Sequence, residues 1–286
     1  MKRKLLSLGC ASAALALLCG CVPLQMADST LRESNFFESM ADAFARKMVE
    51  YAENAKSVET VELVRRTYTT AETITRVEVE DNNAPIEIRT GTGDKVTVEY
   101  GEPEDQSFYT ISVRGGTLSV ERLERKLGGV RLTGDDTLVI TLPEKEYASI
   151  EADTDNGSLK VENLSARQME LGSDNGDIET KNVTAQSLSA ETDNGTARLT
   201  DTTAQYLEAQ SDNGEIILER TTADVYDCET DNGSITGTLN GSAEEYSIQV
   251  SKKNGSSNLS SRTLAGAKKS IRFQTDNGDI QVEFAG

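Results

Sequence analysis

The tetrapeptide Thr/Ser-Asp-Asn-Gly recurs through the second half of this 286-residue chain. The asparagines of the first five copies are 19 residues apart, at positions 156, 175, 194, 213 and 232. A degraded Lys-Lys-Asn-Gly copy follows with its asparagine at 254, and a clean copy with its asparagine at 277. The clean Asn-Gly pairs are Asn156, Gly157, Asn175, Gly176, Asn194, Gly195, Asn213, Gly214, Asn232, Gly233, Asn277 and Gly278. A period of this length indicates small units stacked on one another.

Each unit is expected to contain two or three very short strands separated by turns. Asn-Gly favours a turn because both residues accept a positive φ at little cost. The asparagines either stack inside as a hydrogen-bonded ladder or only supply the positive φ, and both roles are structural. Apolar residues tend to lie six and four positions before each asparagine and three and five positions after it, as with Leu207, Ala209, Ile216 and Leu218. This spacing of two is typical of a strand with one buried side. A file of small residues, Ala166, Ala185, Ala204 and Ala223, closes the repeat.

Two architectures are compatible with such units. An antiparallel meander with Asn-Gly at every second turn requires strands of about seven alternating residues. The apolar arms cover only three to five positions, and a turn region of constant length interrupts every unit. We therefore favour a parallel β-solenoid with rungs of about 19 residues, in which stacked units share one core.

Residues 1–20 predict a lipoprotein signal peptide. A positive Met-Lys-Arg-Lys start precedes an apolar stretch that is too short for a good membrane span. The stretch ends in Leu-Cys-Gly-Cys at Cys21, which resembles the bacterial lipobox. The resemblance implies cleavage before Cys21 and a diacylglycerol on its sulfur, which attaches the protein to a membrane. The alternatives are ordinary signal-peptide cleavage and an apolar N-terminus with no such function.

Cysteine usage agrees with export of a protein that has no disulfide framework. Cys10 and Cys19 leave with the signal peptide, Cys21 is expected to be acylated, and Cys228 remains alone. Cys228 occupies an apolar position of the repeat, so we expect a buried thiol rather than a nucleophile.

One amphipathic helix is expected N-terminal to the β-structure. After a tether over residues 21–32, apolar residues recur every three or four positions in residues 33–57, with Ser34 as a suitable N-cap. The helix can cap the solenoid, lie on a membrane or pair with another chain. Capping is favoured because terminal rungs need a cover. Its acidic residues disfavour membrane binding.

Residues 58–143 predict an irregular β region that starts the solenoid, and residues 144–286 predict the regular array. The irregular region contains a hairpin signal around Arg-Gly-Gly at 114–116 and a strand, 137–143, that ends in Leu-Pro.

With the Asn-Gly units that follow, residues 72–286 resemble the bacterial "putative adhesin" domain of unknown function and the related toast-rack domains. Asn83-Ala84 and Lys252-Lys253 depart from the repeated motif. The resemblance implies a right-handed β-solenoid on secreted or envelope proteins, some linked to envelope-stress signalling, with no catalytic residues to transfer.

Composition excludes several kinds of chemistry. The chain has no histidine, which removes His-based catalysis and makes a zinc site improbable. It has no tryptophan, which argues against a carbohydrate-stacking platform. The net charge is −19, and loss of the three basic residues of the signal peptide leaves 26 basic against 48 acidic residues, or −22. Binding of nucleic acid or of anionic lipid by the solenoid is therefore disfavoured. We expect no cofactor.

The aspartates of the motif form the one file of candidate metal ligands. In register, neighbouring carboxylates lie one strand spacing, about 4.8 Å, apart. Their repulsion, about 0.9 kcal/mol per pair in water, could be relieved by Ca²⁺. We favour a structural role instead, in which each aspartate bonds the turn backbone and points to solvent. The calcium candidates are Asp155, Asp174, Asp193, Asp212, Asp231 and Asp276.

Three functions remain open. The first is a noncatalytic, adhesin-like envelope lipoprotein that binds an envelope protein or a polysaccharide, or acts as a scaffold. The second is an envelope-stress sensor or accessory lipoprotein that acts through a membrane partner. The third is a Ca²⁺-dependent polysaccharide-active β-helix enzyme. The third is disfavoured because Lys252 and Lys253 replace the motif aspartate instead of joining it, so no basic group serves the carboxylates.

Overall fold

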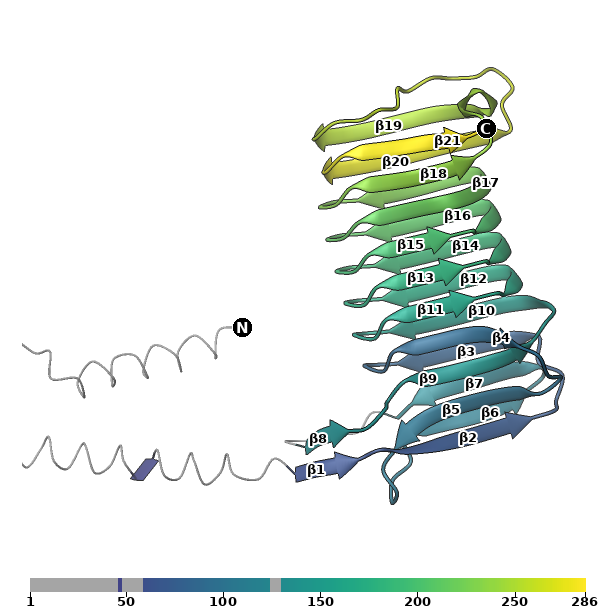
Figure 1. Cartoon of the computed structure of the whole chain (residues 1–286), viewed down its shortest axis with the longest axis vertical. Coiled ribbons are helices and arrows are strands. Elements are labelled where there is room, and N and C mark those ends of the chain that lie inside the picture. Colours follow the sequence, from purple (N-terminus) through teal and green to yellow (C-terminus); the bar gives the residue numbers. More distant parts are fainter. Residues whose placement is uncertain (1–45, 48–58, 124–129) are drawn as a thin grey trace, which may run out of the picture. The chain divides into compact units, whose positions relative to one another are not determined.

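The computed structural model describes residues 46–47, 59–123 and 130–286. Residues Glu59–Gly286 form one unit, a tall stack of strands (Figure 1). The signal peptide, the tether and Cys21 lie outside the described residues. So does the helix expected over 33–57, apart from Arg46 and Lys47.

Each regular rung contains one long and one short strand. The long strands are β10 (Glu146–Thr154), β12 (Ser165–Ser173), β14 (Thr184–Thr192) and β16 (Thr203–Ser211). The short strands are β11 (Leu159–Glu162), β13 (Ile178–Lys181) and β15 (Ala197–Thr200), and β17 (Ile216–Thr230) runs through a short and a long position. Every strand pairs in parallel with its equivalent one rung away, for example Ile150 with Met169 and Met169 with Leu188. The parallel β-solenoid is confirmed.

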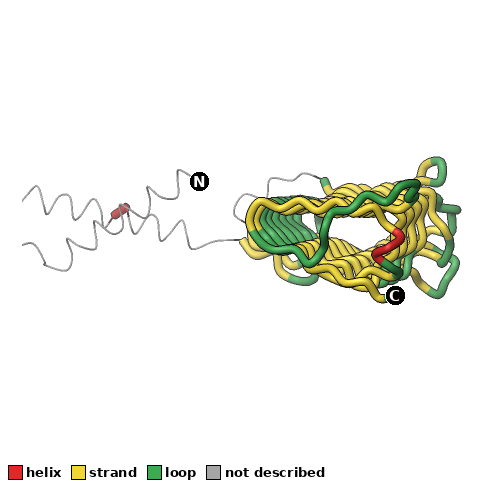
Figure 2. The backbone as a smooth tube through the Cα atoms, turned by 90° about the horizontal axis from the view of Figure 1, so that it is seen from above, coloured by secondary structure: helices red, strands yellow, loops and turns green. Residues whose placement is uncertain are grey.

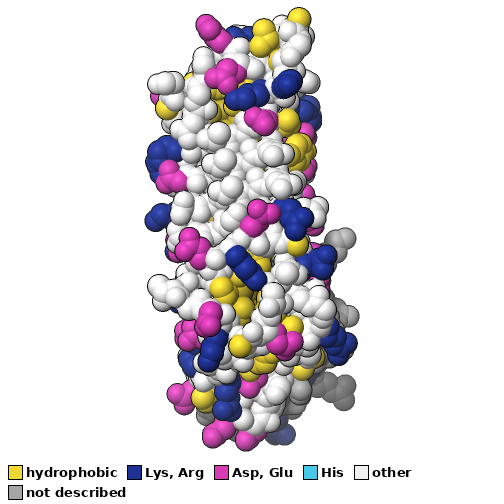
Figure 3. All heavy atoms as spheres, turned by 90° about the vertical axis from the view of Figure 1, so that its right-hand side faces the viewer, with side chains coloured by type: hydrophobic (Ala, Val, Ile, Leu, Met, Phe, Trp, Pro, Cys, Tyr) yellow, Lys and Arg dark blue, Asp and Glu magenta, His cyan; other side chains and the backbone are white. Residues whose placement is uncertain are grey.

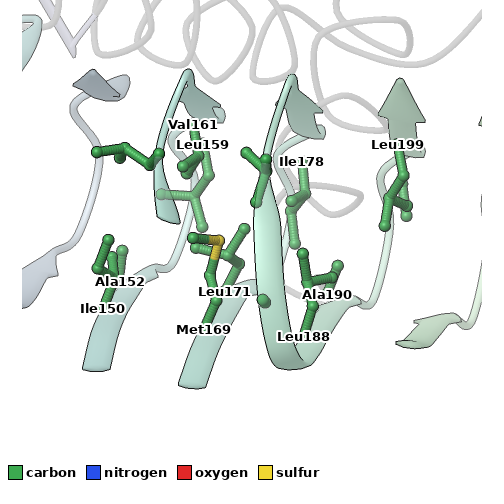
Figure 4. Close-up of a cluster of buried hydrophobic side chains, with 14 of the residues drawn as sticks. Ile150, Ala152, Leu159, Val161, Met169, Leu171, Ile178, Leu188, Ala190 and Leu199 are labelled. Carbon is green, nitrogen blue, oxygen red and sulfur yellow. The ribbon is translucent and has the colours of Figure 1, made fainter. Parts of the chain in front are cut away.

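The core lies between the long-strand sheet and the short-strand sheet. Seen from above, strands form the two long sides of the stack and loops form its narrow ends (Figure 2). Side chains of the long strands, such as Met169 and Leu171, point toward those of the short strands, such as Leu159 and Ile178 (Figure 4). These residues are buried, as are the alanines Ala166, Ala185, Ala204 and Ala223. The apolar files predicted from the spacing are therefore the internal files of the core.

The N-terminal end adds antiparallel strands to the solenoid. Its strands are β1 (Glu59–Glu62), β2 (Val64–Thr70), β3 (Arg76–Asp81), β4 (Ile86–Gly91), β5 (Val96–Glu102), β6 (Tyr109–Arg114), β7 (Thr117–Arg122), β8 (Val130–Thr133) and β9 (Leu138–Pro143). The rung formed by β3 and β4 stacks on β10 and β11, and the later strands β7 and β9 lie beyond it. The predicted hairpin at 114–116 joins β6 and β7.

Chain order and spatial order also differ at the C-terminal end. This end contains β18 (Ile235–Asn240), the 3₁₀ turn η1 (Ala243–Glu245), β19 (Tyr246–Asn254), β20 (Lys269–Asn277) and β21 (Ile280–Ala285). Strand β20 lies between β17 and β19, and β21 stacks on β18. The clean last copy of the motif therefore stacks on the fifth copy, and the degraded copy forms the outermost rung.

Candidate functional site

The hydroxyl of the repeated motif joins neighbouring rungs. Ser173 is buried, and its Oγ donates to the carbonyl of Gly157 in the preceding rung (3.1 Å) and accepts from the amide of Gly176 in its own turn (2.8 Å). Equivalent bonds of 2.8–3.0 Å run from Thr192, Ser211, Thr230 and Thr275 to the preceding glycine carbonyl. Ser or Thr at the first motif position satisfies both backbone groups, because a small hydroxyl can donate one hydrogen bond and accept another.

The glycine of the motif is required by close contact between rungs. A Cβ on Gly176 would lie 1.8 Å from the carbonyl oxygen of Gly157, and the other clean copies give 1.8–2.1 Å. None of these glycines or asparagines has a positive φ; among the copies of the motif only Gly255, in the degraded copy, does. The turn is present, but the prediction that Asn-Gly supplies positive φ is wrong. The glycine is there because the backbones approach too closely for a side chain.

The asparagines form a ladder on the outside of this edge. Asn194 is exposed, and its Nδ2 donates to Oδ1 of Asn175 (3.0 Å) and to the carbonyl of Asp174 (3.1 Å). The same Nδ2–Oδ1 bond, 2.8–3.0 Å long, joins Asn83, Asn156, Asn175, Asn194, Asn213, Asn232, Asn277 and Asn254 in that spatial order. Of the two roles considered for the asparagines, the ladder is therefore the one the structure contains, on the exposed edge instead of the interior.

The motif aspartates lie beside this ladder, one per rung. Asp155, Asp174, Asp193, Asp212 and Asp231 are exposed, and Asp276 is partly buried in an ion pair with Lys253. Among the residues that the structure describes, no three acidic, Cys or His side chains gather as a metal site requires. The calcium file stays a prediction that this geometry does not support.

The opposite narrow edge contains a second file that the sequence reasoning missed. Asn163, Asn182, Asp201 and Arg220, again 19 residues apart, have φ between 49° and 58°, the left-handed region. Asn182 donates to Asn163 (2.8 Å), and Arg220 forms a bidentate pair with Asp201 (2.7 and 2.8 Å). The enrichment of Asn and Asp at this spacing was the available signal. Figure 3 shows this side, where uncharged groups cover the middle and both kinds of charge lie around it.

The outer side of the long-strand sheet is strongly acidic. Two files of carboxylates cross it in register, for example Glu78, Glu151 and Glu170 in one file. We call the following eight residues the acidic face: Glu78, Glu80, Glu121, Glu151, Asp153, Glu170, Glu191 and Glu208. Within residues 59–123 and 130–286 none of the eight forms an ion pair. Nearer the C-terminus, by contrast, Arg272 pairs with Asp227 and Glu229.

The acidic face is hollowed around Asp153. One open hollow of about 380 Å³ has Glu151, Asp153, Glu170 and Glu191 in its lining, and a neighbouring one of about 340 Å³ shares Glu151 and Asp153. Gly172 makes this space, since a Cβ there would lie 2.2 Å from Oδ1 of Asp153. Desolvation, and then the nearby carboxylates of Glu151, Glu80, Glu170 and Glu191, raise the pKa of Asp153. The face thus concentrates negative charge that the described part of the chain does not neutralise.

The short-strand sheet has mixed charges on its outer side. Lys160 pairs with Glu162 (3.1 Å), and Arg198 pairs with Glu219 (2.8 Å). The acidic face, with no ion pair among the described residues, therefore lies on the long-strand sheet and has no counterpart in these mixed charges of the short-strand sheet.

The remaining thiol is structural. Cys228 is fully buried in the core file, and this burial raises the pKa of its thiol, so it is not an activated nucleophile. No helix in the described part of the chain is long and apolar enough to cross a membrane.

The in-register rungs and the ladders between them define a parallel β-solenoid domain. The model of the family described as Toastrack DUF4097 matches residues 74–285, and the chain belongs to this family. This match confirms the resemblance drawn from the repeated motif.

Similar solved structures include putative adhesins from two bacteria. The one from Bacteroides fragilis NCTC 9343 has 15% identity and a TM-score of 0.45, over 78% of this chain and 97% of that chain. The one from Parabacteroides distasonis ATCC 8503 has 15% identity and a TM-score of 0.46, over 79% and 100%. A putative lipid binding protein from the same strain has 15% identity and a TM-score of 0.46, over 80% and 100%. Among curated proteins, none matches the chain.

Proposed function

We propose that this protein is a noncatalytic cell-envelope lipoprotein, adhesin-like, whose solenoid binds a surface partner or acts as a scaffold. The observation that carries the proposal is the acidic face: eight carboxylates without an ion pair among the described residues, fixed by the parallel register of six strands. A rigid face of one sign attracts a partner that carries positive charge, and charge complementarity raises the rate and selectivity of association.

A noncatalytic role agrees with the chemistry of the described residues. The hollows on the acidic face contain carboxylates and hydroxyls, and the chain has no histidine to move a proton near neutral pH. The thiol of Cys228 is buried away from them. A polysaccharide-active enzyme would need Ca²⁺, so thermal unfolding with and without Ca²⁺ tests that alternative. An unchanged unfolding temperature would show that the protein does not bind Ca²⁺, and the Ca²⁺-dependent enzyme would then lack its metal ion.

The binding role is tested by removing charge from the acidic face. In Glu151→Gln/Glu170→Gln/Glu191→Gln three adjacent rungs lose one carboxylate each, with little change in shape. We expect this variant to capture at least about tenfold less partner than the wild type in a cross-linking pull-down from intact envelopes, a loss of about 1.4 kcal/mol.

The matched control removes the same charge from the short-strand sheet. Glu162→Gln/Glu179→Gln/Glu219→Gln should capture as much partner as the wild type, because these carboxylates lie on the outer side of the opposite sheet. Equal losses in both variants would show a general charge effect and would remove the acidic face as the binding surface. A membrane signalling protein as the main captured partner would favour the stress-sensing role over adhesion.

The membrane anchor is a separate part of the proposal. Cys21→Ser removes the sulfur that carries the lipid, and we expect the protein to appear in the soluble fraction, because acyl chains supply the attachment. Fractionation of cells with an immunoblot measures this. Retention of the variant in the membrane fraction would show that another anchor exists.

A further inference from the structure

The two ends of the solenoid differ in how their edge strands are covered. At the C-terminal end, the outer edge of β19 is covered by the chain itself. The amide and carbonyl of Ile248 bond to the carbonyl and amide of Arg262 (2.9 and 2.8 Å), and the amide of Val250 donates to Oγ of Ser261 (2.9 Å). Lys252 and Lys253 follow on the same strand, and exposed lysines are a common device against pairing with another strand. This end is protected from further strand addition.

At the N-terminal end, an edge of the short-strand sheet has no partner strand among the residues that the structure describes. Strand β2 pairs only with β5, and β1 pairs only with β8, among the strands of residues 59–123 and 130–286. Figure 1 shows β1 and β2 in line at the bottom of the stack, with β8 and β5 above them. Strand β2, Val-Arg-Arg-Thr-Tyr-Thr-Thr, has no proline, glycine or lysine, and β-branched or aromatic residues occupy five of its seven positions. Such an edge is a template for another strand.

We propose that this edge is a homodimer interface, in which β2 pairs antiparallel with β2 of a second copy about a two-fold axis at Thr67. This register uses all seven residues. It places Arg66, whose guanidinium pairs with Glu102 of its own copy (3.6 Å), opposite Tyr68 of the second copy, and Arg65 opposite Thr69. Moving the axis to Arg65 or Arg66 would set two arginines face to face, and moving it to Tyr68 would leave only five paired residues. A second copy therefore fits in one register.

The other free edge at this end is less suited. Strand β6 pairs only with β7 among the described strands, but it has six residues and lacks a neighbour that extends its edge as β1 extends that of β2. Pairing through β2 would continue one sheet across two molecules and place the covered C-terminal ends far apart. Two acidic faces on one particle would also give bivalent binding.

Analytical ultracentrifugation of the full chain in detergent tests the dimer. We expect a concentration-dependent dimer, and Thr67→Lys should raise its dissociation constant at least about tenfold, because two like charges then face each other across the axis. Thr110→Lys, an exposed position on β6, is the control and should leave the dimer intact. Thermal unfolding checks that both variants fold. A wild-type monomer at every concentration, or greater dissociation by Thr110→Lys, would overturn the proposal.

Cross-linking tests the position of the axis. Opposite residues of an antiparallel pair have Cα atoms about 4.5–5.5 Å apart, which suits a disulfide. Thr67→Cys should give a covalent dimer on mild oxidation. Thr110→Cys, and the wild type with its own cysteines, should not. If the chain's own N-terminal segment covers the edge, Thr67→Cys will stay monomeric and its thiol will be unreactive, which contradicts the proposal. Equal cross-linking by Thr110→Cys would also contradict it.

Discussion

The two narrow edges of the solenoid turn the same chain in different ways. At the Asn-Gly edge, each glycine lies under the carbonyl of the preceding rung, and Thr or Ser and Asn bond across the gap. At the opposite edge, residues with φ near 50° reverse the chain, and their identity changes from asparagine at 163 and 182 to aspartate at 201 and arginine at 220. Both edges repeat every 19 residues, but only one repeats its sequence.

The difference shows what fixes a residue in a repeat. Where the backbones of adjacent rungs touch, there is no room for a Cβ, so glycine recurs in every clean copy of the motif. Where the chain must only adopt a left-handed conformation, several residues serve at a cost of about 1–2 kcal/mol or less. Sequence regularity in this solenoid therefore follows contact between rungs and not the turn as such.

The largest effect is expected from Gly195→Ala. The new Cβ would lie 2.1 Å from the carbonyl oxygen of Gly176, and backbone on both sides cannot move without disturbing the ladder. We expect the free energy of unfolding to fall by about 3 kcal/mol or more in denaturant titration. Gly93→Ala is the control: its Cβ would approach no atom closer than 3.9 Å, so its effect should stay within about 0.5 kcal/mol. Similar losses in the two variants would disprove the contact argument.

Ser173→Ala tests the hydroxyl. It leaves the carbonyl of Gly157 and the amide of Gly176 without this partner in a buried place, which should cost about 1–3 kcal/mol. Ser173→Thr is the matched control, because threonine fills the same position at 154, 192 and 230, and it should restore most of the wild-type stability. If threonine is as harmful as alanine, the loss comes from packing and not from the hydrogen bonds.

A smaller effect is expected from Asn194→Ala. It removes the ladder bonds to Asn175 and Asp174 and the one accepted from Asn213, all on the exposed edge. Water replaces part of these hydrogen bonds, so we expect the free energy of unfolding to fall by only about 1 kcal/mol in the same titration. Asp193→Ala, next to it, removes no ladder bond, because only the backbone carbonyl of Asp193 accepts one, and it should change stability by less than about 0.5 kcal/mol. Equal effects would mean that the ladder adds nothing beyond the turn.

The smallest effect is expected on the opposite edge. Arg220→Asn keeps a residue that tolerates φ of 53°, and the exposed pair with Asp201 that it loses contributes little, so stability should stay within about 0.5 kcal/mol. Arg220→Val, β-branched and unsuited to this conformation, should cost about 1 kcal/mol. A large loss from Arg220→Asn, measured by thermal unfolding, would show that this edge also depends on side-chain identity.

Much of the fold could be predicted because a solenoid repeats its core residues in sequence. Leu207, Ala209, Ile216 and Leu218 could be placed in internal files from their spacing alone, and the family followed from the motif. The role of the motif glycine could not be predicted. A glycine can be required because two backbones approach closely or because the residue needs a positive φ, and the sequence Asn-Gly is the same in the two cases.

The ends and the acidic face were also beyond the sequence reasoning. Which copy stacks on which depends on long-range pairing, and the degraded copy at 252–255 gives no sign that it lies outside the copy that follows it. The carboxylates of the acidic face alternate with core residues along six strands. In the sequence they therefore cannot be distinguished from ordinary solvent-facing residues of a strand. Only the parallel register brings Glu151, Asp153 and Glu170 together.

Distances along the aspartate file test the stacking most directly. With spin labels at 155 and 276, pulsed electron paramagnetic resonance should report a label-to-label distance that matches the Cα separation of about 24 Å, five strand spacings. Labels at 155 and 253 should report about 29 Å, one spacing more, because the degraded copy lies outermost. A longer distance to 276 than to 253, or distances that do not follow a constant spacing, would contradict the account.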